Sequence, residues 1–419
     1  MDRLAVYLRG SRVGTLIADE RPGDYSFVFD DHVVRAGAGE TVISVSLPVR
    51  AEPYGPLEAR PFFEGLLPER GIREDIARNL RISEQNSFAL LSAIGRDAAG
   101  AVVLLPENEE PSTAGTIDWL SDQQLVELIR RLPTSPLGVS GTSKIRLSLA
   151  GLQRKAVLVR SGDGTFGLPN ESAPSTHILK PQYPDTEYNN LVYNEAFCMR
   201  VAECVGLSVA RTELIFVGES PCLLVERFDR STDGETRIRL HQEDLCQALG
   251  IVPGLKYEGE GGPGFRAIFE LLGDVSYRAG ADVLALIRAI AVNFVLGNND
   301  AHGKNFALLF GESGLQLAPL YDIVSTAVYP EVENSLAMSI GTELNATAVG
   351  SADLLELARE CHLNPRQLAD EWARTAARTA ECAQSVAGLM RAEGLHVPVI
   401  DQIVELAQQR AGQLSPDSE

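Results

Sequence analysis

Residues 298–305 have the sequence Asn-Asn-Asp-Ala-His-Gly-Lys-Asn and directly follow a strongly apolar segment, Val283–Leu296. Gly297, between them, can end a helix with a left-handed cap. Residues 306–320 contain two short apolar runs separated by Gly-Glu-Ser-Gly, which is the pattern of a β-hairpin. A carboxylate, Asp322, follows the second run. The stretch therefore predicts a helix, a polar loop and a hairpin, with acidic side chains before and after the hairpin.

The polar residues of this stretch have the spacing of a phosphoryl-transfer site. Asp300 and Asn305 are five positions apart, and Asp322 lies just past the hairpin. In protein kinases this order supplies a catalytic base, a metal-binding amide and a metal-binding carboxylate. Oxygen donors suit Mg²⁺, and a carboxylate can accept the proton of a hydroxyl group. The alternative is a solvated loop whose acids have no catalytic role.

The composition indicates a globular chain of two or three domains. The sequence has 419 residues, is 45% hydrophobic and carries a formal net charge of −20. This acidic balance argues against broad nucleic-acid binding by the chain itself. The N-terminus lacks signal-peptide features and no segment approaches the ~20 apolar residues of a membrane span, so we expect a cytoplasmic location and no membrane partner.

The six cysteines are scattered and show neither a CxxC pair nor metal-ligand spacing. We therefore expect buried free thiols rather than a disulfide framework. The cysteines are Cys198, Cys204, Cys222, Cys246, Cys361 and Cys382.

The first hundred residues predict a small β-rich module without catalytic spacing. Short β-rich runs are followed by two helices and a further strand. The expected runs are residues 3–8, 12–18, 24–29 and 41–47, the helices 72–80 and 87–94, and the strand 100–105. A linker rich in Glu and Pro, Pro106–Gly115, then separates this module (1–108) from the next part (119–240).

The part from 119 to 240 predicts the upper lobe of a nucleotide clamp. Ser121 begins a capping box for a helix, and Ala156–Arg160 and Thr176–Lys180 predict strands. Lys180, at a strand end, can reach phosphate oxygens as a point charge. The next helix, near 188–204, contains Glu195 away from its apolar face. Glu195 is either an ion-pair partner of Lys180 or a solvated surface acid.

The remainder, 241–412, predicts a mostly helical lobe with a frayed tail at 413–419. Helices are expected near 266–272, 282–296, 352–361, 365–390 and 398–412. Gly259–Gly264 is glycine-rich, but its order matches neither a Walker A motif nor a dinucleotide fingerprint, so we interpret it as a turn. The fold class expected from these elements is α+β: a bilobal, protein-kinase-like fold with a β-rich N-terminal lobe, an accessory N-terminal module and an all-helical C-terminal lobe.

Several further motifs, in the same order along the chain, resemble the HipA family of bacterial toxin kinases. The N-terminal module contains Phe-Phe-Glu-Gly-Leu-Leu-Pro (62–68), and residues 148–155 are Ser-Leu-Ala-Gly-Leu-Gln-Arg-Lys. Thr-His-Ile-Leu-Lys (176–180) resembles the family's ATP-lysine strand, and Val-Glu-Arg-Phe (225–228) its hinge. The resemblance extends over essentially the full length and implies the bilobal kinase fold.

The resemblance also implies site residues. Asp300 would be the catalytic base and Lys180 would hold the phosphates, while Asn305 and Asp322 would bind Mg²⁺. Ser148 would be a site of autophosphorylation that silences the enzyme, since a phosphate dianion beside ATP repels it. The nucleotide-binding candidates are Ala150, Gly151, Leu152, Gln153, Arg154, Lys155, Lys180, Glu226, Arg227, Phe228, His302, Lys304, Tyr321 and Asp322.

The family resemblance further implies ATP and Mg²⁺ as cofactors and a toxin of a type II toxin–antitoxin system. The expected partner is a HipB-like helix-turn-helix antitoxin dimer, with operator DNA bound mainly through that antitoxin. The expected substrate is a translation component such as an aminoacyl-tRNA synthetase, whose phosphorylation induces persistence. Two alternatives remain: a small-molecule or lipid-type kinase of similar fold, and a catalytically weak co-repressor subunit.

Overall fold

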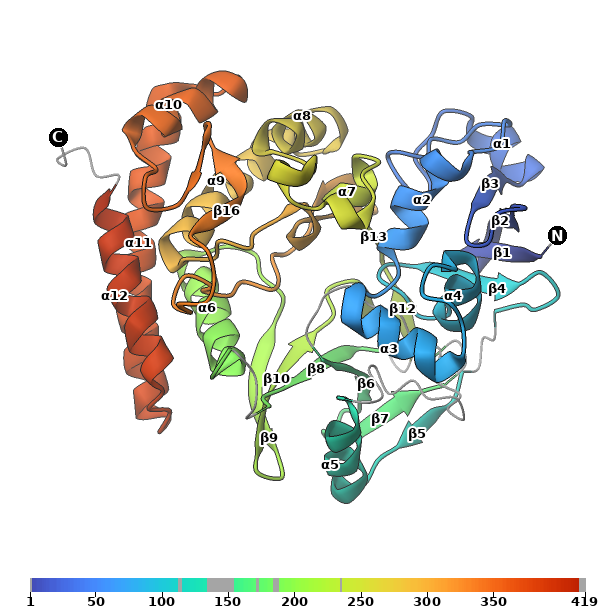
Figure 1. Cartoon of the computed structure of the whole chain (residues 1–419), viewed down its shortest axis with the longest axis horizontal. Coiled ribbons are helices and arrows are strands. Elements are labelled where there is room, and N and C mark those ends of the chain that lie inside the picture. The colour runs from blue at the N-terminus through green and yellow to red at the C-terminus, as the bar shows by residue number, and fades with distance from the viewer. Residues whose placement is uncertain are drawn as a thin grey trace. The chain divides into compact units, whose positions relative to one another are not determined.

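The chain forms two compact units, each built from several stretches of sequence. The computed structural model describes residues 2–111, 115–133, 154–170, 173–183, 188–233 and 236–413 (Figure 1). Unit 1 lies within residues 1–181, 216–254 and 309–311, and unit 2 within 182–215, 255–308 and 312–419. Each unit mixes helices and strands, so the α+β class is confirmed.

Unit 1 begins with a four-stranded antiparallel sheet of order β3-β2-β1-β4. Its apolar face and three helices share one hydrophobic core, which includes the buried rings of Tyr25, Phe27, Phe62 and Phe63. The elements are β1 (Arg3–Leu8), β2 (Ser11–Ala18), β3 (Tyr25–Phe29), α1 (Asp31–Gly37), α2 (Pro56–Gly65), α3 (Arg70–Leu80), α4 (Ser87–Ile94) and β4 (Val102–Pro106).

The second sheet of unit 1 has the order β5-β7-β6-β8-β10-β9. Strand β9 starts in unit 2, and only its last two residues belong to unit 1. The helix α5 carries the capping box that the sequence predicts, with Ser121 and Gln124 bonding reciprocally. The elements are β5 (Ile117–Trp119), α5 (Asp122–Arg131), β6 (Ala156–Arg160), β7 (Phe166–Pro169), β8 (His177–Pro181), β9 (Thr212–Val217) and β10 (Ser220–Glu226).

The last part of unit 1 connects the second sheet back to the N-terminal module. A two-stranded ribbon leaves the end of β10 and returns to a short strand and helix. These elements are β11 (Arg230–Asp233), β12 (Thr236–Arg239), β13 (His241–Asp244), α7 (Leu245–Ala248) and the 3₁₀ turn η2 (Pro253–Leu255). α7 packs against α2 of the module, and the Gln247 amide donates to the Phe62 carbonyl over 2.7 Å.

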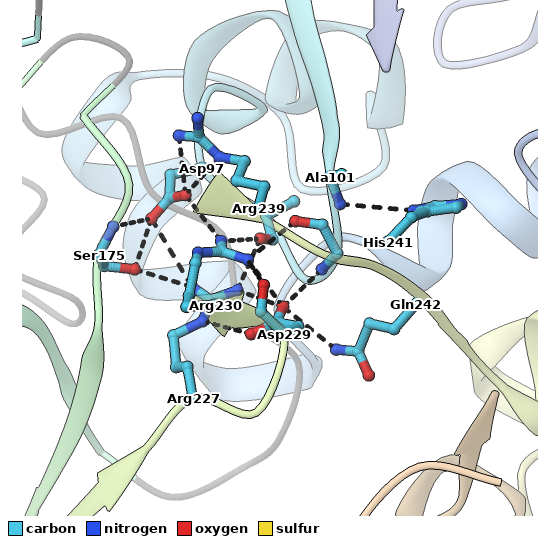
Figure 2. A network of polar contacts seen from close by, with 11 residues as sticks. Asp97, Ala101, Ser175, Arg227, Asp229, Arg230, Arg239, His241 and Gln242 are labelled. Carbon is cyan, nitrogen blue, oxygen red and sulfur yellow. Dashed lines mark hydrogen bonds and ion pairs between the residues drawn. The ribbon is translucent and has the colours of Figure 1, made fainter. Parts of the chain in front are cut away.

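A buried ion network joins the module to the start of this ribbon (Figure 2). The Asp97 carboxylate lies 2.9 Å from an Arg230 nitrogen and 3.0 Å from an Arg239 nitrogen. Arg227 and Arg230 also bind Asp229, at 2.7 and 2.9 Å. Asp97 and Asp229 are 0% and 2% exposed, so both carboxylates interact with arginines in a setting shielded from water.

The network holds Asp97 in its charged form. Burial raises the pKa of this carboxyl, but the positive charges of Arg230, Arg239 and Arg227, with a hydrogen bond from Ser175, outweigh it. The pKa of Asp97 therefore lies well below its usual range. Removing one member of such a network leaves buried charge without compensation, which costs about 3–5 kcal/mol.

Unit 2 is built around the helix α9 (Ala279–Leu296), which packs against α8, α11 and α12. α9 has the length and composition of a membrane span, but 61% of it is buried inside the fold, as in the central helix of a folded unit. Figure 1 shows α11 and α12 side by side, in orange and red. The other elements are α6 (Leu191–Val205), η3 (Glu258–Glu260), α8 (Phe265–Val275), η4 (Gly303–Asn305), β14 (Ala307–Gly311, which ends in unit 1), β15 (Gly314–Leu317), β16 (Ser335–Ile340), β17 (Glu343–Asn345), α10 (Ser351–Glu360), α11 (Pro365–Ala392) and α12 (Pro398–Gln413).

Among the differences from the sequence expectations, three concern strands and cysteines. Residues 41–47 form no strand, because the Val45 amide and Ser44 hydroxyl donate to the buried Glu243 carboxylate instead of to a neighbouring strand. The C-terminal part is not all-helical: besides the expected hairpin at β14–β15, it contains a second one at β16–β17. Finally, Cys204 and Cys382 form a disulfide between α6 and α11, although the other four cysteines are free and buried.

Asp97→Asn is expected to lower the free energy of unfolding at pH 7 by about 3–5 kcal/mol, because three arginines lose a buried counter-charge. Because the folded-state pKa is depressed, the stabilisation is fully present above the usual value of 3.8 and is lost as the pH falls below it. Urea unfolding at pH 7 and at pH 3 measures both effects.

The control is Asp118→Asn on β5, where the side chain is exposed. Equal stabilities of Asp97→Asn and Asp118→Asn at pH 7 would contradict a structural role for the buried network.

Candidate active site

The predicted catalytic loop begins where α9 ends, in unit 2. Gly297 has φ +77°, the left-handed cap expected from the sequence. The backbone angle favours glycine, and a Cβ atom there would also displace the end of the Leu406 side chain of α12, which would lie 2.5 Å away. The cap directs the chain sharply out of the helix into residues 298–305.

Buried hydrogen bonds fix the loop from several sides. Asn299 donates its main-chain amide to the Thr326 hydroxyl over 2.9 Å and accepts at its carbonyl from the Ala337 amide over 2.7 Å. The Asn298 side chain donates to Asn293 over 2.7 Å. Asn298 and Asn299 are 5% and 3% exposed, so these bonds are shielded from water and hold the residues next to Asp300 in one conformation.

Arg410, on α12, adds a buried cation to this support. Its guanidinium donates to the Phe294 carbonyl in the last turn of α9 over 2.7 Å and to Asn299 Oδ1 over 3.3 Å. The group also lies 5.2 Å from the centre of the Phe294 ring. Burial lowers the pKa of Arg410 to about 10, which still leaves it charged at pH 7. A cation at the carboxyl end of a helix is favourable, so Arg410 holds the helix end and the loop together.

Asp300 itself is exposed, and its carboxylate is held by a tyrosine. The Tyr257 hydroxyl donates to Asp300 Oδ1 over 2.9 Å. The Tyr257 ring packs edge-on against His302, with ring centres 5.5 Å apart. The side chain of Asp300 is therefore accessible to solvent, and the hydrogen bond from Tyr257 orients its carboxylate through one of the two oxygens.

The two predicted metal ligands lie next to each other. Asn305 Nδ2 is 3.4 Å from Asp322 Oδ2, and Asn305 Oδ1 accepts from the main-chain amide of His302 over 3.1 Å. Asp322 has φ +60°, a left-handed conformation that costs a non-glycine residue energy and persists where its surroundings impose it. The adjacent Tyr321 hydroxyl donates to the Lys304 carbonyl over 2.6 Å, which ties the far side of the hairpin to the loop.

The predicted nucleotide lysines lie on adjacent strands of the second sheet in unit 1. Ala156 of β6 pairs with Leu179 of β8. Lys155, directly before β6, and Lys180, directly after Leu179 on β8, therefore occupy neighbouring positions at the same end of the sheet. They are 6% and 7% exposed. Arg154, just before them, forms an ion pair with Asp75 of α3.

The predicted hinge, Glu226–Phe228, is only partly suited to nucleotide contact. The Arg227 guanidinium is buried in the ion network: it donates to Asp229, to the Ser175 hydroxyl and to the Ala98 carbonyl. Its main-chain amide donates to Thr176 over 3.0 Å. The Arg227 side chain is thus a structural group, whereas Glu226 is exposed and Phe228 is half-buried.

Other predicted site residues are placed as follows. Glu195, on α6 of unit 2, is 1% exposed, so the alternative of a solvated surface acid is wrong. His302 and Lys304 are buried in the catalytic loop, at 5% each. Ser148, Ala150, Gly151, Leu152 and Gln153 lie outside the described residues.

An exposed carboxylate on the same fixed loop as an amide that contacts a second carboxylate has the residue types expected of a kinase-type phosphotransferase site. Family models agree. Residues 147–384 match the HipA-like C-terminal domain and residues 4–105 match the HipA N-terminal domain. The chain belongs to the HipA family and is a serine/threonine protein kinase.

Individual relatives support the family and the fold. Putative kinase Y4mE of Sinorhizobium fredii is 44% identical over 366 residues, which cover 85% of each chain. The serine/threonine-protein kinase toxin HipA of Shewanella oneidensis is 33% identical over 302 residues, covering 69% of this chain and 68% of the toxin. The structure of the Shewanella oneidensis HipA, HipB and operator DNA complex matches with a TM-score of 0.84 at 26% identity, covering 98% of this chain and 97% of that chain.

The sequence interpretation did not identify Arg410 as part of the loop support, nor Tyr257 as a contact of Asp300. A signal existed for Arg410: it continues the spacing of Ile403 and Ala407, both buried, so it lies on the apolar face of its helix. An arginine on such a face indicates a buried partner. Tyr257 gave no local signal, because its partner is 43 residues away.

Arg410→Met is expected to lower the free energy of unfolding by about 2 kcal/mol, because two buried oxygens lose their donors while the side-chain volume is kept. We also expect a fall in kcat of about tenfold, because a small displacement of a catalytic group is costly. Urea unfolding and the kinase assay described below measure the two effects.

The matched control is Gln409→Met, an exposed neighbour on α12. An Arg410→Met variant as stable and as active as Gln409→Met would show that the buried contacts of Arg410 are dispensable.

Proposed function

We propose that this kinase is the toxin of a type II toxin–antitoxin system and that Asp300 is its catalytic base. The observation that carries the proposal is the cluster in unit 2. There the Tyr257 hydroxyl orients the exposed Asp300. Asn305 Nδ2 lies 3.4 Å from Oδ2 of Asp322, which follows the β14–β15 hairpin. The similarity to the serine/threonine-protein kinase toxin HipA of Shewanella oneidensis supports the biological role.

In the proposed reaction the hydroxyl oxygen of a substrate serine or threonine attacks the γ-phosphorus of ATP. The bond from that phosphorus to the β–γ bridging oxygen breaks, ADP leaves, and the hydroxyl proton passes to Asp300. Tyr257 holds Oδ1, so Oδ2 is the oxygen that we assign to the proton. Such general-base catalysis contributes about 10²–10⁴-fold to the rate.

Asn305 and Asp322 have the right chemistry for Mg²⁺. One carboxylate and one amide oxygen are hard donors, and Mg²⁺ in kinases is completed by phosphate oxygens and water. Among the described residues no group of three or more His, Cys, Asp or Glu side chains is placed to hold a metal. When bound, Mg²⁺ would neutralise phosphate charge.

Lys155 and Lys180 are the proposed phosphate-binding groups of unit 1. Two ammonium groups at neighbouring strand positions, both nearly buried, concentrate positive charge at one end of the sheet. Such an arrangement favours a polyanion. Glu226 and Phe228 are proposed to hold the adenine, and Arg227 would contribute only its main chain. Glu195, buried on α6, remains the proposed partner of Lys180. Ala150–Arg154, His302, Lys304 and Tyr321 complete the proposed nucleotide site.

The proposed biology follows the family. A HipB-like antitoxin dimer would restrain the kinase and tether it to operator DNA, as the Shewanella complex contains these components. The formal net charge of this chain is −20, which favours DNA contact through such a partner over direct DNA contact. The substrate would be a cytoplasmic translation component, possessing an accessible serine or threonine hydroxyl, such as an aminoacyl-tRNA synthetase.

Asp300→Asn is expected to lower the rate of γ-phosphate transfer at least about 100-fold and to abolish growth inhibition, because the amide cannot accept the proton. The assay incubates the full chain with [γ-³²P]ATP, Mg²⁺ and bacterial lysate and follows label in protein. ATP binding should persist in the variant.

Asp274→Asn, an exposed change on α8, is the control and should retain full activity. A fully active Asp300→Asn enzyme would refute the base assignment. If the label appeared only in small molecules, the chain would act as a small-molecule kinase instead of a protein kinase.

Ser148→Ala is expected to remove label from the chain itself and to prolong toxicity, because the silencing phosphate can no longer form. Mass spectrometry of tryptic peptides locates the label. Phosphate on another residue of the active wild-type chain, with Ser148 unmodified, would contradict this form of regulation.

A further inference from the structure

The glycine-rich segment 256–264 is wound tightly around one carbonyl group. The amides of Glu260 and Gly262 both donate to the Tyr257 carbonyl, over 3.0 and 2.8 Å. A Cβ atom on Gly262 would lie 2.3 Å from the Leu255 carbonyl oxygen and 2.7 Å from that of Tyr257. Glycine at 262 is therefore required for the close approach, and the winding fixes the main chain of Tyr257.

The segment is anchored to the body of unit 2 by its next residue. The Glu258 carboxylate accepts from the Ser339 amide of β16 over 2.5 Å. Glu258 also lies against Gly264, where a Cβ atom would be 2.4 Å from Glu258 Oε1. α8 begins directly afterwards at Phe265. Tyr257 is thus fixed by the winding of its own segment on one side and by β16 on the other.

Tyr257, fixed in this way, contacts the exposed Asp300 of the proposed catalytic loop. Its hydroxyl donates to Asp300 Oδ1 over 2.9 Å, and its ring packs edge-on against His302 at 75°. Two contacts, one polar and one through the ring, restrict both the position and the tilt of the tyrosine. A carboxylate that receives a directed hydrogen bond at one oxygen loses rotational freedom about its Cβ–Cγ bond.

We propose that Tyr257 is a positioning residue for phosphoryl transfer: the glycine-rich segment presents its hydroxyl to Asp300, which points the other carboxylate oxygen at the substrate hydroxyl. The inference rests on the proposed role of Asp300 as base. It gives segment 256–264 a function that its sequence pattern did not indicate, since the pattern predicts only a turn. Tyr257 acts through Asp300 and takes no proton itself.

Tyr257→Phe tests the proposal in the ³²P assay with the full chain at varied ATP concentration. Loss of the hydroxyl should lower the maximal rate about tenfold while leaving the KM for ATP and the thermal midpoint unchanged, because only the orientation of the base is affected. Tyr277→Phe is the matched control: its hydroxyl donates to Gln316 over 3.3 Å on an exposed surface, and its rate should equal wild type.

Gly262→Ala tests the role of the segment. The added methyl group must displace the Tyr257 carbonyl, so we expect the same loss of maximal rate as in Tyr257→Phe. Gly273→Ala, exposed on α8 with no atom within 4 Å of the added Cβ, should leave the rate unchanged.

The outcomes separate this inference from the proposed function. An unchanged maximal rate in Tyr257→Phe, or a loss explained wholly by a raised KM for ATP, overturns the positioning role. If Asp300→Asn is inactive in the same assay while Tyr257→Phe is fully active, only the present inference fails. If Asp300→Asn is active, the assignment of Asp300 as the base fails, and the positioning role of Tyr257 fails with it.

Discussion

One buried carboxylate, Asp97, is the constraint on which unit 1 depends. It belongs to the N-terminal module, yet it neutralises Arg227, Arg230 and Arg239 at the exit of the second sheet. Without Asp97 the charge of these guanidinium groups would be incompletely compensated, which is destabilising, so the contact with the module stabilises these strands. This explains why residues of the module and of the second sheet form one compact unit. Arg227 in particular shows that a residue of the hinge motif can serve the junction through its side chain.

Unit 2 uses the opposite charge for a similar purpose. Arg410 is a buried cation whose partners are neutral oxygens, the Phe294 carbonyl at a helix end and the Asn299 amide. The aligned carbonyls at the carboxyl end of α9 supply the negative potential that a carboxylate supplies elsewhere. In both units a buried charge fixes the segment next to a proposed functional group.

The sequence predicted the local geometry of residues 297–322 better than their surroundings, for a physical reason. Asp300, Asn305 and Asp322, the Gly297 cap and the β14–β15 hairpin are defined by short-range chemistry that neighbouring residues already contain. The disulfide joins Cys204 and Cys382, which are 178 residues apart, so the spacing of the cysteines along the chain does not predict it. Residues 41–47 have strand-like composition, but their donors bind Glu243, almost 200 residues later. Burial of Glu195 likewise depends on which helices cover α6.

The exposure pattern of the proposed catalytic loop bears on how the proposed chemistry would be controlled. From Gly297 to Lys304 every residue is buried except Asp300. A loop with a buried backbone and a single exposed side chain has little freedom of its own, because its neighbours determine its conformation. Substitutions at the buried positions should therefore change the direction of the Asp300 carboxylate rather than its accessibility. The hydroxyl of Tyr257 then governs the one freedom that remains, the rotation of the carboxylate, which is why a residue outside the loop can affect the reaction.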